Sequence, residues 1–245
     1  MELKPIRTDD QPANRGFSYE PAQDVAIAEQ GPQSAQRVLR NTYLLLALTM
    51  VPTVIGAMVG MATGGVILAN PIISTLVMLA AVIGLQFGIA ANRNSGVGIA
   101  LLLLMTGLLG WWLGPILNFA LAMRNGMQLV GYAAVGTGVI FFVMGAIATT
   151  TKRDFSFMGK FLFVGMIALL IAMLANMFLQ IPALSLAIST LVIVVFSLFL
   201  LYDLQRIIRG GETNYVMATT GVYMSLFNIF ANLLYLLMAL TGEKD

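Results

Sequence analysis

Long apolar stretches without a charged residue alternate with short polar segments through most of this 245-residue sequence. The uncharged stretches are residues 41–92, 94–123, 125–151, 161–202 and 213–242. One membrane-spanning helix needs about 20 apolar residues. The first and fourth stretches therefore predict two helices each, and the other three predict one each. Pro71 and Pro182 mark the breaks inside the two long stretches, because proline disrupts a helix that precedes it.

The predicted membrane domain extends from residue 38 to residue 241. Its seven spans lie at about residues 42–62, 69–91, 96–118, 127–149, 158–178, 183–203 and 216–240. We therefore expect an all-α fold, a polytopic bundle of seven transmembrane helices. Residues 242–245 would form a short external tail.

The N-terminal segment, residues 1–37, has a different composition from the rest of the chain. It is rich in Gln, Pro, Asp, Arg and Ala and has few large apolar side chains. Such a segment buries too little surface to offset the entropy lost on ordering, so we expect a disordered cytoplasmic tail. Two roles remain open for it: a passive extension, or a handle that another protein grips.

The distribution of basic residues predicts the orientation of the bundle. All but Arg124 and Lys244 of the 13 Lys and Arg residues fall before the first predicted helix or after the second, fourth and sixth. An excess of Lys and Arg marks cytoplasmic loops. The N-terminus is therefore expected in the cytoplasm and the C-terminus on the outer side.

A stripe of polar residues runs along the last predicted helix. Ser225, Asn228 and Asn232 are spaced i, i+3 and i+7, so they share one helix face. Lipid offers no hydrogen-bond partners, so this face must turn toward protein, which predicts a central position for the last helix. The favoured interpretation is hydrogen bonding between helices, and the alternative is the lining of an ion or solute path.

Asp203 is a carboxylate directly after a long apolar run, at the end of the sixth predicted helix. A charge at membrane depth is costly unless it is paired, hydrated or protonated. Arg206 lies at i+3 and offers a partner along the helix, and Arg209 is a second nearby cation. One interpretation is an ordinary residue at the membrane interface. The other is a latch, sensitive to pH or to cations, between Asp203, Arg206 and Arg209 and the last helix at Ser225.

Three pairs of glycines have the spacing that allows helix backbones to approach closely in a membrane. They are Gly56 with Gly60, Gly84 with Gly88, and Gly110 with Gly114. These pairs predict a compact bundle and say nothing more specific about function.

Composition supports a membrane protein and argues against several classes of function. Hydrophobic residues make up 59% of the chain and charged residues 10%, whereas a soluble domain carries roughly 25% charged residues. Cysteine and histidine are absent, which excludes thiol chemistry, Cys or His metal sites and Ser-His triads. The basic residues lie between apolar spans, which is typical of orientation signals and not of nucleic-acid binding. We expect no enzymatic activity, no cofactor and no nucleic-acid partner, and the pattern predicts no particular oligomeric state.

Several short blocks resemble the bacterial YccA-type branch of the Bax inhibitor-1 (TMBIM) family. They are RNTY at residues 40–43, GPILN at 114–118, TTKRDFSF at 150–157, ANMFLQ at 175–180, GGETNY at 210–215 and SLFNIF at 225–230. The resemblance covers about residues 37–241. It implies a seven-helix bundle with the last helix at the centre, in the bacterial inner membrane.

The same resemblance implies two activities. The YccA-type branch modulates the membrane-anchored, ATP-dependent protease FtsH, which engages the cytoplasmic N-terminal tail of these proteins as that of a poor substrate. The wider family is associated with a pH-sensitive calcium leak through two aspartates, one on each of the last two helices. The first aspartate matches Asp203, but the second position falls on Ser225 here. We therefore expect a protein that binds and restrains an FtsH-type protease, with the calcium or cation leak as the alternative.

Overall fold

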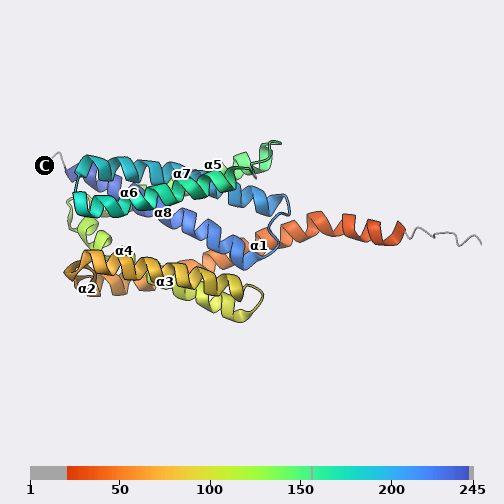
Figure 1. The fold of residues 1–245 in the computed structure, drawn as a ribbon, viewed down its shortest axis with the longest axis horizontal. Coiled ribbons are helices and arrows are strands. Elements are labelled where there is room, and N and C mark those ends of the chain that lie inside the picture. Colours follow the sequence, from red (N-terminus) through yellow and green to blue (C-terminus); the bar gives the residue numbers. More distant parts are fainter. Residues whose placement is uncertain (1–20, 156, 243–245) are drawn as a thin grey trace, which may run out of the picture.

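The computed structural model describes residues 21–155 and 157–242, and their side chains from residue 35 onward. The described chain is helical throughout and has short connections (Figure 1). The helices are α1 (Pro21–Thr63), α2 (Gly65–Ala69), α3 (Pro71–Ala91), α4 (Gly96–Ala122), α5 (Gly126–Thr150), α6 (Met158–Leu179), α7 (Pro182–Ile208) and α8 (Tyr215–Gly242).

The prediction of an all-α bundle with seven spans is confirmed for the described part of the chain. All of its helices except the short α2 are long and apolar enough to cross a membrane, and in α1 the crossing part is Ala35–Thr63. Helix α1 begins at Pro21, upstream of the predicted domain boundary. Residues 1–20 of the predicted tail lie outside the described residues, so its disorder stays a prediction. Helix α7 continues past Asp203 to Ile208, so this carboxylate lies inside the helix and not at its end.

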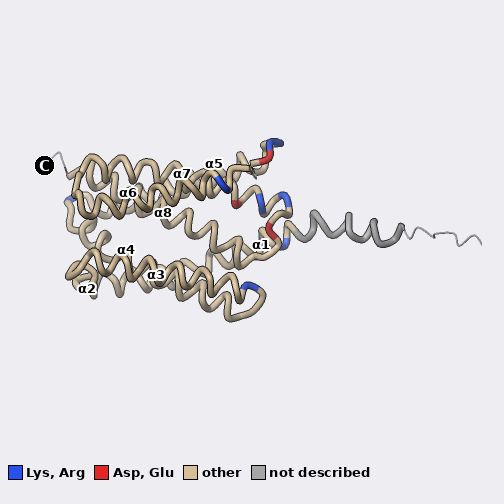
Figure 2. The backbone as a smooth tube through the Cα atoms, viewed as in Figure 1, with Lys and Arg blue, Asp and Glu red and all other residues tan. Residues whose placement is uncertain are grey.

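Charged residues gather at one end of the bundle. Figure 2 shows most of the Lys and Arg residues at the end where α1 enters and where the α3–α4, α5–α6 and α7–α8 connections lie. Charge is costly at membrane depth, so this distribution places the hydrocarbon region between the two ends. The orientation relative to the cytoplasm stays a prediction from the same basic residues.

Two of the three glycine pairs form one close interface between α1 and α4. A Cβ atom added at Gly56 or Gly60 of α1 would collide with the backbone of Gly107 or Trp111 of α4. An added Cβ at Gly110 or Gly114 of α4 would in turn collide with the backbone of α1. The two backbones are therefore in direct contact, as the spacing predicts.

The third pair, on α3, has a different environment. A Cβ at Gly84 would meet nothing within 4 Å, and one at Gly88 would meet only the Leu101 side chain, at 3.2 Å. The α3 pair therefore takes no part in a backbone contact, because the spacing alone does not specify which face of a helix meets a neighbour.

Side-chain hydrogen bonds join α1 and α4 at the end of the bundle opposite the charged end. The Trp111 indole N–H donates to the Thr63 hydroxyl at 2.8 Å, and the Asn118 amide donates to the Met61 carbonyl at 2.6 Å. These bonds join the end of α1 to the second half of α4. They give Trp111 a partner within the protein, in addition to the anchoring at the membrane interface that its residue type favours.

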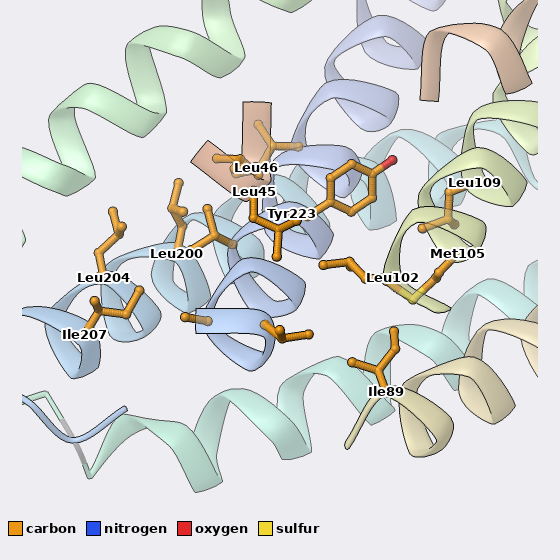
Figure 3. Packing of buried hydrophobic residues seen from close by; sticks show 14 of the residues in the cluster. Leu45, Leu46, Ile89, Leu102, Met105, Leu109, Leu200, Leu204, Ile207 and Tyr223 are labelled. Carbon is orange, nitrogen blue, oxygen red and sulfur yellow. The ribbon is translucent and has the colours of Figure 1, made fainter. Parts of the chain in front are cut away.

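Helix α8 packs against α1, α3, α4, α5 and α7. None of the side chains from 215 to 239 is fully exposed, which agrees with the central position expected for the last helix. Tyr223 of α8 lies in the core with leucines of α1, α4 and α7 (Figure 3). Its hydroxyl shares a hydrogen bond of 2.8 Å with Thr53 of α1 and donates to the Thr106 carbonyl of α4 at 3.4 Å. One side chain thus joins three helices.

The glycine interface yields a matched pair of variants. We expect Gly110→Ala to lower the free energy of unfolding by about 1–3 kcal/mol, since the added methyl group overpacks a backbone contact. Gly84→Ala adds the same methyl group where nothing lies within 4 Å and should leave stability almost unchanged. Thermal unfolding of both variants in detergent measures the difference. Equal stability of the two would contradict the assigned interface.

Candidate functional site

Asp203 faces a cavity of about 310 Å³ between α3, α6, α7 and α8. Polar side chains line part of its wall, and the remainder is mainly apolar. The polar residues are Gln86, Asp203, Arg206, Glu212, Thr220 and Ser225. This is where the structure brings together Asp203 and Ser225, the two positions that the sequence singles out on the last two helices.

The Asp203 carboxylate lies in close contact with Gly221 of α8. A Cβ atom added at Gly221 would lie 2.7 Å from one Asp203 carboxylate oxygen and 3.3 Å from the other. Ser225 follows Gly221 by four residues and so lies on the same face of α8. The absence of a side chain at Gly221 is therefore what allows the carboxylate to approach α8 beside Ser225.

Arg206 forms its ion pair with Glu212 and not with Asp203. The Arg206–Glu212 distance is 3.0 Å, and the guanidinium also lies over the Tyr202 ring, 5.7 Å from its centroid. Within the described residues, neither Asp203 nor Ser225 has a hydrogen bond to a protein group. The i+3 spacing offers a pairing of Arg206 with Asp203. Arg206 pairs instead with Glu212 of the α7–α8 connection. Glu212 supplies the second carboxylate of the cavity.

Arg209 turns away from Asp203 toward the α5–α6 connection. Its guanidinium donates to the carbonyls of Thr151, Lys152 and Arg153 at 3.3, 2.9 and 2.7 Å, and it lies 4.0 Å from the Asp154 carboxylate. A planar guanidinium with several N–H groups suits this convergence of carbonyls. Arg209 is therefore a tether for a loop and not part of a latch with Asp203.

Gln205 strengthens the same tether, and sequence reasoning did not single it out. Its side chain is 2% exposed. It accepts a hydrogen bond from the Phe155 N–H and donates to the Arg153 carbonyl, both at 2.8 Å. The sequence offered one signal for this role. Gln205 lies in the last turns of a helix beside apolar residues, where its long side chain can reach the next connection.

Asn214 ties the α7–α8 connection to the α3–α4 connection. Its side-chain oxygen accepts from the Val216 and Met217 N–H groups at 3.0 Å, capping the first turn of α8. Its amide N–H groups donate to the Arg93 carbonyl at 2.9 Å and to Asn94 at 2.8 Å. The start of α8 is therefore fixed next to the Asp203 cavity.

The polar stripe of α8 divides between different cavities. Ser225, 2% exposed, lines the Asp203 cavity, whereas Asn228 and Asn232 line two cavities farther along α8. The two amides donate to carbonyls of their own helix, those of Met224 at 2.8 Å and Asn228 at 2.9 Å. Among the described residues, neither amide bonds to another helix. The favoured expectation of interhelical bonds was wrong for this pair, because an asparagine in a helix can satisfy its N–H on the preceding turn.

A sequence model of the family described as "Inhibitor of apoptosis-promoting Bax1" matches residues 35–242. The chain belongs to this family, the Bax inhibitor-1 family. The match covers the seven spans and the connections that tie them together. It confirms the family resemblance carried by the short sequence blocks.

Bacterial relatives are similar over most of the chain. A membrane protein of Vibrio cholerae is 43% identical over 201 residues, which cover 82% of this chain and 88% of that protein. A protein of Escherichia coli K12 described as "Modulator of FtsH protease YccA" is 42% identical over 204 residues, covering 83% and 90%. A protein of Pseudomonas aeruginosa is 39% identical over 220 residues, covering 90% and 96%.

The tether of the α5–α6 connection can be tested by proteolysis. We expect Arg209→Gln to make trypsin cleavage after Lys152 and Arg153 about tenfold faster, because loss of charge-assisted hydrogen bonds favours local opening. Digestion of the purified protein in detergent, followed by mass spectrometry of the fragments, measures the rate. Arg124→Gln, which also removes one basic side chain, is the control and should leave that rate unchanged. A wild-type rate in Arg209→Gln would show that the loop does not depend on this tether.

Proposed function

We propose that this protein is an inner-membrane protein that binds an FtsH-type membrane protease and restrains its proteolysis. The proposal depends mainly on one observation, the 42% identity with the Escherichia coli modulator of FtsH protease across 90% of that protein. A protein that is 42% identical, from another Escherichia coli strain, is described as an inner membrane protein. Similarity over nearly the whole membrane domain supports a shared partner more than similarity of a single motif would.

The mechanism we propose is competition for the protease. The N-terminal segment leads into the membrane-crossing part of α1 (Ala35–Thr63), which enters the bundle at the end where the basic connections gather. By the positive-inside rule this is the cytoplasmic end. A protease would engage the tail there but would have to separate α1 from the bundle to proceed. The backbone contact of α1 with α4 and the Tyr223 hydrogen bond oppose that separation.

Removing the tail tests this mechanism. We expect deletion of residues 2–30 to abolish FtsH-dependent turnover of the protein and to release the protease toward its other substrates. Pulse-chase measurement of both half-lives in membranes follows the two effects together. A control replaces residues 2–30 with a Gly/Ser segment of equal length. Retained turnover in the control shows that tail length suffices, and unchanged turnover in the deletion rejects the tail mechanism.

Crosslinking in native membranes tests binding separately from turnover. The bundle without residues 2–30 should still co-purify with the protease if the membrane helices contribute contacts. If neither the full chain nor the deletion co-purifies with the protease after crosslinking, the proposed partnership is wrong.

A cation leak is the second candidate, and the geometry around Asp203 favours it. The carboxylate faces a cavity, has no hydrogen bond within the described residues, and lies beside Ser225 on the central α8 and beside Glu212. Carboxylate and hydroxyl oxygens are the ligands that hard cations prefer. The described residues contain no group of three or more acidic side chains that would hold such an ion tightly, which suits passage more than storage.

Calcium flux into proteoliposomes tests this second candidate. We expect Asp203→Asn to reduce the flux by about tenfold, since the variant replaces the carboxylate that has no ion-pair partner in the cavity by a neutral group of equal size. Asp154→Asn, on the α5–α6 connection and outside the cavity, is the matched control and should conduct as the parent does. No flux through the parent protein at any pH would reject the leak.

A further inference from the structure

A second cavity, of about 420 Å³, lies mainly between α6, α7 and α8. Asp203 does not line it, but it shares Met166 and Phe196 with the Asp203 cavity. It is lined by residues near the middle and the outer half of these helices, including Met166, Ser189 and Asn228. Its size falls in the range of small-molecule pockets, about 300–1,000 Å³. The groups on which the proposed leak depends, Asp203, Ser225 and Glu212, do not line it.

Ser189 of α7 is the first of the polar groups that indicate a ligand in this cavity. Its side chain is 7% exposed and lines the cavity, yet its hydroxyl has no hydrogen-bond partner among the described residues. Other hydroxyls of α7 bond to carbonyls of the preceding turn, such as Ser197 to Ile193 at 2.7 Å and Thr190 to Leu186 at 2.9 Å. The Ser189 hydroxyl therefore differs from its neighbours: it is open to the cavity, and a group inside the cavity can bond to it.

Two amides of α8 bring further free acceptors to the same cavity. Asn228 and Asn232 use an N–H on carbonyls of their own helix, and within the described residues their side-chain oxygens accept no hydrogen bond. Tyr235 also lines the cavity, and its hydroxyl likewise has no partner within the described residues. These three residues also border an adjoining cavity of about 530 Å³ that reaches α3 and Trp112 of α4. Hydrogen-bonding groups therefore converge from two helices on one continuous region.

The rest of the lining decides the class of ligand. No charged residue lines either cavity, and most of the other lining residues are apolar. A charged ligand at this depth would stay unpaired, which is costly. Water alone would leave most of the wall without a suitable partner. We propose that this cavity binds a neutral amphiphile from the bilayer, with a hydroxyl head on Ser189 and Asn228 and an apolar chain along α6.

Photolabelling of the full-length protein in lipid nanodiscs tests the site. The probe is dodecanol that carries a diazirine in its alkyl chain, and mass spectrometry locates the adducts. We expect adducts on Leu170 and Val192, which line this cavity and not the neighbouring ones, with competition by excess dodecanol. Dodecyl methyl ether has a similar size but cannot donate a hydrogen bond, so it should compete about fivefold more weakly, the effect of one hydrogen bond.

Three variants separate binding from folding. Ser189→Ala and Asn228→Leu should each lower labelling about fivefold. Ser197→Ala removes a hydroxyl of the same helix that does not line the cavity, and it should label as the parent does. Ser189→Ala should also keep the parent's melting temperature, because the hydroxyl it removes has no partner in the protein.

Three results would overturn the proposal. The first is adducts spread equally over lipid-facing residues such as Val194, and the second is equal competition by alcohol and ether. The third is unchanged labelling in Ser189→Ala and Asn228→Leu. The first result would mean that water fills the cavity. The other two would mean that apolar chains bind there without a hydrogen-bonding head group.

Discussion

The lack of hydrogen-bond partners in lipid is the constraint on which this structure depends. A helix that carries amides, hydroxyls and a tyrosine can cross a bilayer only if other protein or an enclosed cavity receives them. Helix α8 meets this requirement by packing against five other helices. Tyr223 illustrates the result, because its hydroxyl reaches both α1 and α4. Other polar side chains of α8, among them Ser225, Asn228 and Asn232, face cavities, and these are the places where a function is to be sought.

The two sides of α8 are packed differently. On one side, α1 and α4 touch backbone to backbone through their glycines, which leaves no space between them. On the other side, α6 lies against α7, and the space between α6 and α8 holds cavities. A closely packed pair next to a loosely packed side is compatible with a protein that resists extraction by a protease and still offers a site within the membrane.

At the charged end of the bundle, side chains hold the connections in place. Arg209 and Gln205 bind the α5–α6 connection to α7, and Asn214 binds the start of α8 to the α3–α4 connection. The Arg206–Glu212 pair lies between these tethers and the Asp203 cavity. Any partner that contacts this end therefore meets a surface whose loops are fixed relative to the cavity. Only a few residues separate each of these connections from Asp203.

The sequence by itself determined the membrane class, the seven spans and the segregation of charge, because these depend on hydrophobicity and length, which are local properties. Its short sequence blocks indicated the family. It also placed Asp203 and Ser225 as positions of interest. Only the tertiary structure decided that Arg206 pairs with Glu212, that Arg209 holds a loop, and that Gly84 has no close neighbour. Spacing along one helix states which residues share a face, but not which helix that face meets. The partners of a long side chain depend on connections far away in sequence, so they are fixed only when the bundle closes.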